Sequence, residues 1–238
     1  MKGIVLAGGT GTRLYPLTHA TSKHLLPIYD KPMIFYPIET LVKAGIDEIL
    51  VVVGGPHAGH YVKVLKNGED FGLKHLEYAY QEETGGISQA IALAEDFADN
   101  GPITVILGDN TTDANIKKEV QAFKAGATIF IKKVPDPERF GVPVFDSKDK
   151  SKIINIEEKP SKPQSSFAVT GVYIYDHHCF NYIRQLEPSG RGELEVTDLN
   201  NLYIKKGQMR WAELKGFWSD AGTFESLYYS TKYWAEKS

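Results

Sequence analysis

The chain has 238 residues, 42% hydrophobic and 24% charged, which is the composition of an ordinary globular protein with a sizeable core. Its 27 Lys+Arg against 30 Asp+Glu give a formal net charge of -3, which argues against nucleic-acid binding, and no apolar run approaches the about 20 residues of a membrane helix. The single cysteine, Cys179, excludes an internal disulfide framework and any multi-cysteine metal site. It favours a reducing, cytoplasmic location, with the thiol buried and inert.

Short apolar runs alternate with segments of helical period in the first half of the chain, which is the pattern of βαβ units in an α/β sheet. The runs are unbroken, as expected for parallel strands covered on both faces, and lie at 3–7, 48–53, 103–107 and 127–131. Helices are predicted between them over 31–44, 57–67, 87–98 and 114–125. Gly45, Gly68 and Gly126 are expected to close three of these helices, and Pro37 is expected to kink the first.

After about residue 135 the sequence favours strands separated by turns that contain proline and serine. We predict strands over 141–145, 152–158 and 167–176, and helices near 177–185, 197–206 and 222–235. Thr197 is expected to cap the second of these helices, with Asp198 in its first turn and Lys205, Lys206 and Gly207 at its end. The whole chain is expected to form one continuous unit.

Four unusual loops follow predicted strands, at 8–13, 54–57, 81–86 and 108–110. Ligands of open α/β sheets bind beyond the carboxyl ends of the strands, so one crevice could collect all four loops.

The first loop, "GGTGTR", contains Gly8, Gly9 and Gly11 beside Arg13, with a further cation at Lys23. Bare backbone N–H groups next to an arginine suit an anion. A dinucleotide fingerprint does not fit, because its sixth position is Leu14, and a P-loop is absent. The remaining alternatives are a phosphate-binding loop and a tight turn with a solvated arginine.

The run "MKGIVLAGGTGTRLYPLTHATSKHLLPIYDKPMIFYPIETL" closely resembles the opening of the sugar-nucleotide pyrophosphorylases, in particular of glucose-1-phosphate thymidylyltransferases. The resemblance continues through "QEETGGISQA", "VILGDN", "DPERFGV", "IEEKP", "SSFAVTGVYIYD", "RGELEVTDLN" and "WSDAGT". It implies a Rossmann-like α/β fold with a mixed, mostly parallel central sheet flanked by helices and an inserted β-rich sugar-binding part. It places a nucleotide-binding core at about 1–135, the sugar-binding part at about 136–215, and a metal loop and last helix at 216–238.

The implied reaction is dTTP plus glucose 1-phosphate giving dTDP-glucose and pyrophosphate, with Mg²⁺ as cofactor. In this reaction an anionic sugar phosphate attacks an anionic nucleotide phosphate, so cations and positioning supply the catalysis. The resemblance assigns catalytic roles to Arg13 and Lys23, and Mg²⁺ to Asp109 and Asp220, which suits a cation that takes few carboxylates plus phosphate oxygens. Its nucleotide-binding set comprises Leu6, Gly8, Gly9, Gly11, Thr12, Arg13, Gln81, Gly86 and Asp109, with Gln81 and Gly86 reading the pyrimidine edge.

The resemblance also assigns a sugar-phosphate set, which comprises Asn110, Gly141, Glu158, Lys159, Val169 and Arg191. Glu158 would accept hydrogen bonds from sugar hydroxyls, while Lys159 and Arg191 would hold the phosphate. As bare sequence, "EEKP" also fits a solvated charged turn, and Gly141 and Val169 fit ordinary strand packing. Glu195 and Asp198 are expected to give structural support.

The sequence departs from the family pattern at three places. Phe140 stands where tyrosine is usual, and "NTTDAN" (110–115) is more polar than the usual apolar continuation. Longer relatives continue beyond the position of Ser238 into helices associated with an effector site, so we expect no end-product control by that route.

Two alternatives to the thymidylyltransferase stay open: the same transfer with UTP, and a catalytically silent sugar-nucleotide sensor. The sensor predicts loss of Arg13, Asp109 or Asp220, and all three are present. The expected partners are small-molecule substrates, with no nucleic acid and no membrane, and a homo-oligomer is left open.

Overall fold

The computed structural model of the chain describes residues 1–83 and 85–237 and divides into two compact units. The β1 unit comprises Lys2–Thr84, Ile106–Lys118 and Gly216–Ser238, and the β8 unit comprises Met1, Gly85–Val105 and Glu119–Lys215. Each unit is named here after its first long strand.

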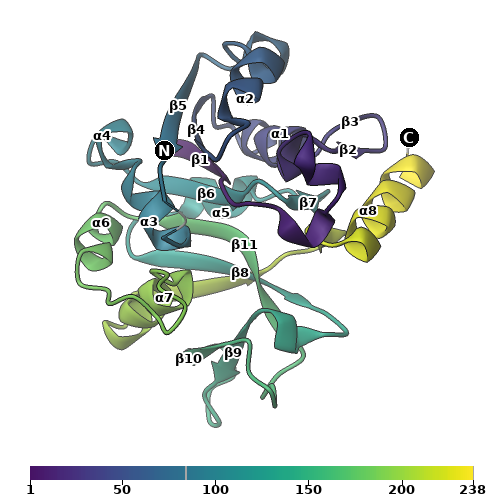
Figure 1. Cartoon of the computed structure of the whole chain (residues 1–238). Helices are drawn as coiled ribbons and strands as arrows, with labels where there is room; N and C mark the ends of the chain where they lie inside the picture. The colour runs from purple at the N-terminus through teal and green to yellow at the C-terminus, as the bar shows by residue number, and fades with distance from the viewer. Residues whose placement is uncertain (84, 238) are drawn as a thin grey trace. The chain divides into compact units, whose positions relative to one another are not determined.

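The β1 unit is built on three parallel strands that run side by side (Figure 1), β1 (Lys2–Ala7), β4 (Glu48–Gly54) and β5 (His75–Gln81). Residues 3–7 of β1 and 49–53 of β4 are buried, as the unbroken apolar runs predict. The unit also contains α1 (Phe35–Lys43), α2 (Ala58–Leu65) and a hairpin of β2 (Pro27–Ile28) and β3 (Lys31–Pro32).

The β1 unit is completed by segments from the middle and the end of the chain. β7 (Asn110–Thr112) pairs antiparallel with β13 (Trp218–Asp220), and α8 (Phe224–Lys237) follows. Short 3-10 turns occupy Thr12–Leu14, Leu17–His19, Lys23–Leu25 and Glu69–Phe71. Three turns in succession after β1 keep the glycine loop and Lys23 close to the strand end from which they come.

The β8 unit has β8 (Ala127–Lys133) between β11 (Phe167–Tyr175), which is antiparallel, and β12 (Met209–Glu213), which is parallel. A hairpin joins β9 (Gly141–Phe145) to β10 (Ile153–Glu158), with a 3-10 turn at Pro137–Arg139 before it. The helices are α3 (Ile87–Ala92), α4 (Glu95–Ala98), α6 (His178–Ile183) and α7 (Val196–Lys205). β6 (Ile103–Leu107) and α5 (Lys117–Ala122) each contain a point where the chain passes from one unit to the other.

Several predicted helix limits are wrong. α1 begins at Phe35 rather than 31, so Pro37 lies in its first turn, where a helix has no backbone partner for an N–H and the proline gives no cause for a kink. α2 ends before Lys66, and Gly68 instead begins the next 3-10 turn. The helix predicted over 87–98 is two helices, and the one over 114–125 is shortened to α5.

The later elements agree better with the sequence. β6 has the predicted limits, α6 and α7 lie within two residues of theirs, and Gly207 follows α7 with a positive φ of 66°. Cys179 is buried as predicted, and burial raises the pKa of its thiol well above the usual range, which disfavours the reactive thiolate.

Candidate active site

The glycine loop that follows β1 leaves its backbone open to a ligand. Gly9 and Gly11 have φ angles of 103° and 65°, which few other residues tolerate. A Cβ on Gly11 would lie 3.1 Å from Thr18 Cγ2 and 3.2 Å from Lys23 Cβ. Thr18 Oγ1 donates a hydrogen bond to the Gly11 carbonyl oxygen at 2.8 Å and holds the turn, while Thr12 and Arg13 are exposed.

The beginnings of the four predicted loops meet in the β1 unit. A Cβ on Gly8 would lie 2.8 Å from Gln81 Oε1, so the amide of Gln81 lies directly against the glycine loop. Gly54 pairs with Gln81 across β4 and β5, and the Gly108 N–H donates to the Leu6 carbonyl oxygen at 2.8 Å. The side chain of Leu6 is buried. The convergence expected at the strand ends is therefore confirmed for these residues, whereas Gly86 belongs to the β8 unit.

A largely buried ion pair between Lys23 and Asp109 lies at this end of the β1 unit. Lys23 Nζ lies 2.6 Å from Asp109 Oδ2, and the two side chains are only 15% and 13% exposed. Asn110 Nδ2 donates to Asp109 Oδ1 at 3.0 Å. Burial alone would raise the pKa of the Asp109 carboxyl, but the charge of Lys23 and these hydrogen bonds outweigh it and hold that pKa well below its usual range.

Asp220 reaches the same place from the end of β13. It is paired with Asn110 in the β7–β13 ladder, and the N–H of the next residue, Ala221, donates to the Asp109 carbonyl oxygen at 2.8 Å. A Cβ on Gly222 would lie 3.1 Å from Arg13 Nη2 and 3.7 Å from Asp220 Oδ2. Arg13 and both predicted metal carboxylates thus lie around one short ladder.

The donor set fits Mg²⁺ held jointly with a nucleotide. Two carboxylates come from adjacent backbone positions, and among residues 1–83 and 85–237 no group of three or more His, Cys, Asp or Glu side chains could hold a metal by itself. Mg²⁺ prefers one or two carboxylates together with phosphate and water oxygens. Asp109 and Asp220 match that preference.

The β8 unit brings together most of the predicted sugar-phosphate residues. Gly141 pairs with Glu158 across β9 and β10, and Lys159 Nζ lies 3.5 Å from Glu158 Oε1. Arg191 Nη2 lies 3.7 Å from the same oxygen and 2.9 Å from Glu195 Oε1. The hydrogen bond to Glu195 raises the pKa of Arg191, and Ser189 Oγ donates to the same carboxylate at 2.7 Å.

Thr197 was given the wrong role. Glu195 is the residue before α7, and Thr197 lies inside the helix, where its Oγ1 donates to Glu158 Oε2 at 2.6 Å instead of capping. The predicted positions of Asp198 in the first turn and Lys205 in the last are confirmed. Nothing in the local sequence around Thr197 indicates its contact with Glu158, which lies 39 residues away in the chain.

Three predicted site residues are placed less directly. Val169 is buried on β11 opposite Ile131, and its contact with a sugar stays a prediction. Asn110 is buried, and its side chain donates to Asp109 and accepts from Trp218 Nε1 at 2.7 Å, so it orients the predicted metal carboxylate. Gly86 has a φ of 96°, and a Cβ there would lie 2.6 Å from the Leu194 carbonyl oxygen.

Sequence reasoning missed a buried hydrogen-bond network beneath the ion pair. His24 Nδ1 lies 2.8 Å from Tyr61 Oη, which also contacts Ser22 Oγ at 2.6 Å and donates to the Ala7 carbonyl oxygen at 3.0 Å. Gly108 lies against the imidazole, since a Cβ there would be 2.8 Å from His24 Cδ2. The network therefore links the end of β1, at Ala7, to the residue that follows β6, Gly108.

Comparison with known proteins places this site in a family. The family model for nucleotidyl transferases matches residues 2–237. A glucose-1-phosphate thymidylyltransferase of Neisseria gonorrhoeae is 47% identical over 96% of this chain and 80% of its own length, and one from Xanthomonas campestris is 44% identical over 95% and 78%.

Solved structures agree in fold. A Bacillus anthracis protein, crystallised with sucrose and assigned provisionally as a glucose-1-phosphate thymidylyltransferase, has a TM-score of 0.92 at 47% identity and covers 98% of this chain and 94% of its own. A UDP-glucose pyrophosphorylase has a TM-score of 0.85 at 24% identity and supports the fold alone. The mixed, mostly parallel central sheet flanked by helices is confirmed. Within the described part of the chain, every helix is too short or too polar to cross a bilayer. The chain belongs to the nucleotidyl transferase family and is an enzyme of the nucleotidyltransferase class.

Proposed function

We propose that the enzyme transfers a thymidylyl group from dTTP to glucose 1-phosphate, giving dTDP-glucose and pyrophosphate. The observation that carries this proposal is the meeting of the glycine loop, Arg13, the Lys23–Asp109 pair and Asp220 at one end of the β1 unit. The names of the 38–47% identical relatives supply the substrates.

The chemistry requires two anions to approach each other. An oxygen of the sugar phosphate attacks the α-phosphorus of the nucleotide while the bond from that phosphorus to the β-phosphate oxygen breaks and pyrophosphate leaves. Positioning of the reactants supplies about 7–11 kcal/mol of barrier reduction. No covalent intermediate or general base is needed, so the residues of the site act by binding the substrates and by stabilising negative charge.

In the β1 unit, the backbone of Gly8, Gly9 and Gly11 binds the triphosphate, and Leu6 and Thr12 flank the loop. Arg13 and Lys23 stabilise the charge on the α-phosphate and the departing pyrophosphate. Asp109 and Asp220 hold Mg²⁺, which neutralises and orients phosphate oxygens when it is bound.

The pyrimidine is recognised by Gln81, with Gly86 at the second position that the family assigns to the base. The amide of Gln81 presents a donor and an acceptor, which match the edge that thymine and uracil share. A methyl group in an apolar pocket discriminates by only about 1–3 kcal/mol, so UTP is expected to serve as a weaker substrate.

In the β8 unit, Glu158 accepts hydrogen bonds from sugar hydroxyls, and Lys159 and Arg191 bind the sugar phosphate, with Gly141 and Val169 as further contacts of the family pattern. The family pattern also counts Asn110, a residue of the β1 unit, among the sugar-phosphate contacts. Thr197 occupies Glu158 Oε2, which leaves Oε1 facing both cations. Arg191 exchanges a carboxylate partner for a phosphate when the sugar binds. Cytoplasmic location and a homo-oligomer stay predictions.

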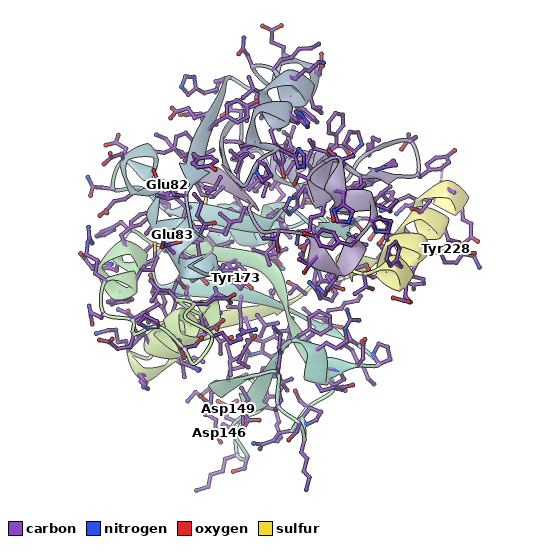
Figure 2. The ribbon with its side chains drawn as sticks, viewed as in Figure 1. Glu82, Glu83, Asp146, Asp149, Tyr173 and Tyr228 are labelled. Atoms are coloured by element: carbon purple, nitrogen blue, oxygen red, sulfur yellow. The ribbon has the colours of Figure 1, made fainter. Side chains whose placement is uncertain are left out.

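The test is pyrophosphate release with Mg²⁺, crossing dTTP and UTP with glucose 1-phosphate and other sugar 1-phosphates. Asp109→Asn keeps the shape of the side chain and removes its charge, and should lower kcat by about 10²-fold or more. Asp149→Asn is the matched control, because Asp149 lies in the exposed turn between β9 and β10 (Figure 2), where its carboxylate contacts Ser151.

Turnover by wild type and Asp149→Asn that is lost in Asp109→Asn supports both the reaction and the metal carboxylate. The ratio of kcat/KM for dTTP and UTP decides the nucleotide. If folded protein binds dTDP-glucose but shows no turnover with any pair of substrates, the proposed transfer reaction is rejected in favour of the sugar-nucleotide sensor.

A further inference from the structure

The last helix of the chain is tied to the metal loop through one carboxylate, that of Asp113. Asp113 Oδ1 accepts a hydrogen bond from the Phe217 N–H at 2.6 Å, and Oδ2 accepts one from Tyr233 Oη at 2.5 Å. Lys237 Nζ forms an ion pair with the same Oδ2 and lies 3.2 Å from Tyr233 Oη. These contacts hold the pKa of Asp113 below its usual range, although burial opposes them. A single side chain thus receives donors from a loop and from the last turns of α8.

The loop before β13 is folded closely over this carboxylate. Gly216 has a φ of 81°, and a Cβ there would overlap Asp113 Oδ1, so this position requires glycine. The ring of Phe217 stacks on that of Tyr233, with centroids 3.8 Å apart and planes at 6°. The anchor is therefore built from packing as well as from charge.

The position of Asp113 in the chain gives the anchor its consequence. Asp113 directly follows β7, and Phe217 directly precedes β13, so their hydrogen bond closes one end of the ladder next to the Trp218–Thr112 pair. Asp220 pairs with Asn110 at the other end, beside Asp109. The ladder has only three residue pairs, and so short a pair of strands is marginal without support at its ends.

The same helix also supports the opposite end of the ladder. Ala221, which follows Asp220, is buried in an apolar cluster with Ile28, Met33 and Tyr36. Leu227 and Trp234 of α8 pack against that cluster, and the rings of Tyr36 and Trp234 lie 4.8 Å apart. α8 therefore contacts the segments on both sides of β13, while Tyr228 on its other face is 71% exposed (Figure 2).

We propose that Asp113, Tyr233 and Lys237 are positioning residues that set the separation of Asp109 and Asp220, and thereby the affinity of the site for a divalent cation. The inference rests on the proposed metal role of those two carboxylates. It also gives a role to Asp113, one of the polar residues of "NTTDAN".

The test compares two lysine-to-methionine variants of α8. Lys237→Met removes a donor to Asp113, whereas the control, Lys232→Met, breaks only an exposed pair with Glu236 on the same helix. Tyr233→Phe is a second variant that keeps the ring stacked on Phe217 and removes only its hydroxyl. Mn²⁺ binding is measured by electron paramagnetic resonance with dTTP and no sugar phosphate, so that no turnover occurs, and backbone hydrogen exchange is followed at 110–112 and 217–220.

We expect Lys237→Met and Tyr233→Phe to weaken Mn²⁺ binding about 3- to 10-fold, below the loss typical of direct partners of metal ligands. Faster exchange in β7 and β13 should accompany it, while the KM for glucose 1-phosphate and the Lys232→Met variant stay unchanged. Wild-type Mn²⁺ affinity and exchange in both folded variants would overturn the inference. If wild type itself binds no Mn²⁺, the metal proposal fails instead, and that outcome is separate from a change in the variants.

Discussion

His24 is a buried side chain whose protonation opposes folding. It is 1% exposed, and burial together with the charge of Lys23 lowers its pKa from 6.5 to about 3. A neutral imidazole carries one N–H donor, and Nδ1 of His24 lies within hydrogen-bond distance of Tyr61 Oη. An imidazolium would carry two N–H donors, and both would need partners. The fold therefore favours the neutral form of His24.

This burial predicts a loss of stability in mild acid. Between pH 6.5 and about 3 the unfolded chain binds a proton at this position and the folded chain does not. The free energy of unfolding is therefore unaffected by protonation of His24 above pH 6.5 and decreases as the pH falls below that value. From pH 7 to pH 5 the decline is about 2 kcal/mol. Urea unfolding of wild type and His24→Gln at both pH values measures it, because glutamine keeps a polar end and does not titrate.

Wild type should lose stability relative to His24→Gln when the pH is lowered from 7 to 5. A difference that is the same at pH 5 and pH 7 would mean that the pKa of His24 is the same in the folded and the unfolded chain. Comparing the two proteins cancels the titration of the carboxylates, which they share.

Thr197 makes a second prediction at the scale of a single residue. Thr197→Val keeps the branched shape within α7 but removes the donor to Glu158 Oε2. A hydrogen bond to a charged group contributes about 1.5–3 kcal/mol, and partial replacement by water leaves an expected increase of about 3- to 10-fold in the KM for glucose 1-phosphate. The KM for dTTP should not change.

Ser165→Ala is the control for this variant. Ser165 also donates a side-chain hydrogen bond in the β8 unit, to the Pro143 carbonyl oxygen at 2.8 Å, but it does not contact Glu158. Steady-state kinetics of both variants give the comparison. An equal rise in both KM values for Thr197→Val would assign Thr197 a structural role in place of one in orienting Glu158.

At the scale of elements, long apolar strands were predictable and short ladders were not. β1, β4 and β6 follow from unbroken apolar runs, because a strand covered on both faces has no polar positions. β7 and β13 have three residues each, and the bond from Thr112 to Phe217 spans 105 positions, so no local pattern marks either strand. Helix ends were misplaced where a glycine began a new turn, as at Gly68.

The candidate site was predictable to a similar extent. The glycine loop and the convergence of strand ends follow from spacing and topology, whereas the pairing of Asp109 with Asp220 required the family resemblance, because the two lie far apart in the sequence. His24 was not singled out, and Thr197 was assigned a capping role, because a lone histidine or threonine has many ordinary uses. Their roles depend on partners, Tyr61 and Glu158, that only the fold brings near.

Gly86 supports a prediction about the connection between α3 and α7. The Leu194 N–H donates to the Gly85 carbonyl oxygen at 2.8 Å, and the Ser88 N–H donates to the Leu194 carbonyl oxygen at 3.1 Å. A Cβ on Gly86 would lie within 2.8 Å of the Leu194 backbone, at a φ of 96°. Gly86→Ala should therefore destabilise the protein by about 2–4 kcal/mol.

Gly190→Ala is the matched control, since a Cβ at Gly190 meets nothing within 4 Å and its φ lies outside the left-handed region that favours glycine. Urea denaturation should find this control within about 0.5 kcal/mol of wild type. Equal stability of the two variants would show that the segment at Leu194 yields without cost.

At the scale of the whole molecule, a chain with a net charge of -3 binds two anionic substrates. Its key cations are already paired with carboxylates, Lys23 with Asp109 and Arg191 with Glu195. Such pairs hold the cations in place before a substrate binds. The expected consequence is that folding does not depend on ligands, whereas ligands add stability by mass action.

Metal removal tests this consequence. In the absence of nucleotide, a chelator should leave the melting temperature unchanged, because the apolar core is formed by protein residues alone. With Mg²⁺ present, dTTP at 100 times its dissociation constant should add about 2.7 kcal/mol, which for a chain of this size is about 5–10 °C. Asp220→Asn should lose the part of this shift that requires Mg²⁺ and keep the melting temperature of the free protein. A chelator that lowers the melting temperature of the free wild type would instead make the metal part of the folded structure, with Asp109 and Asp220 acting before any nucleotide binds.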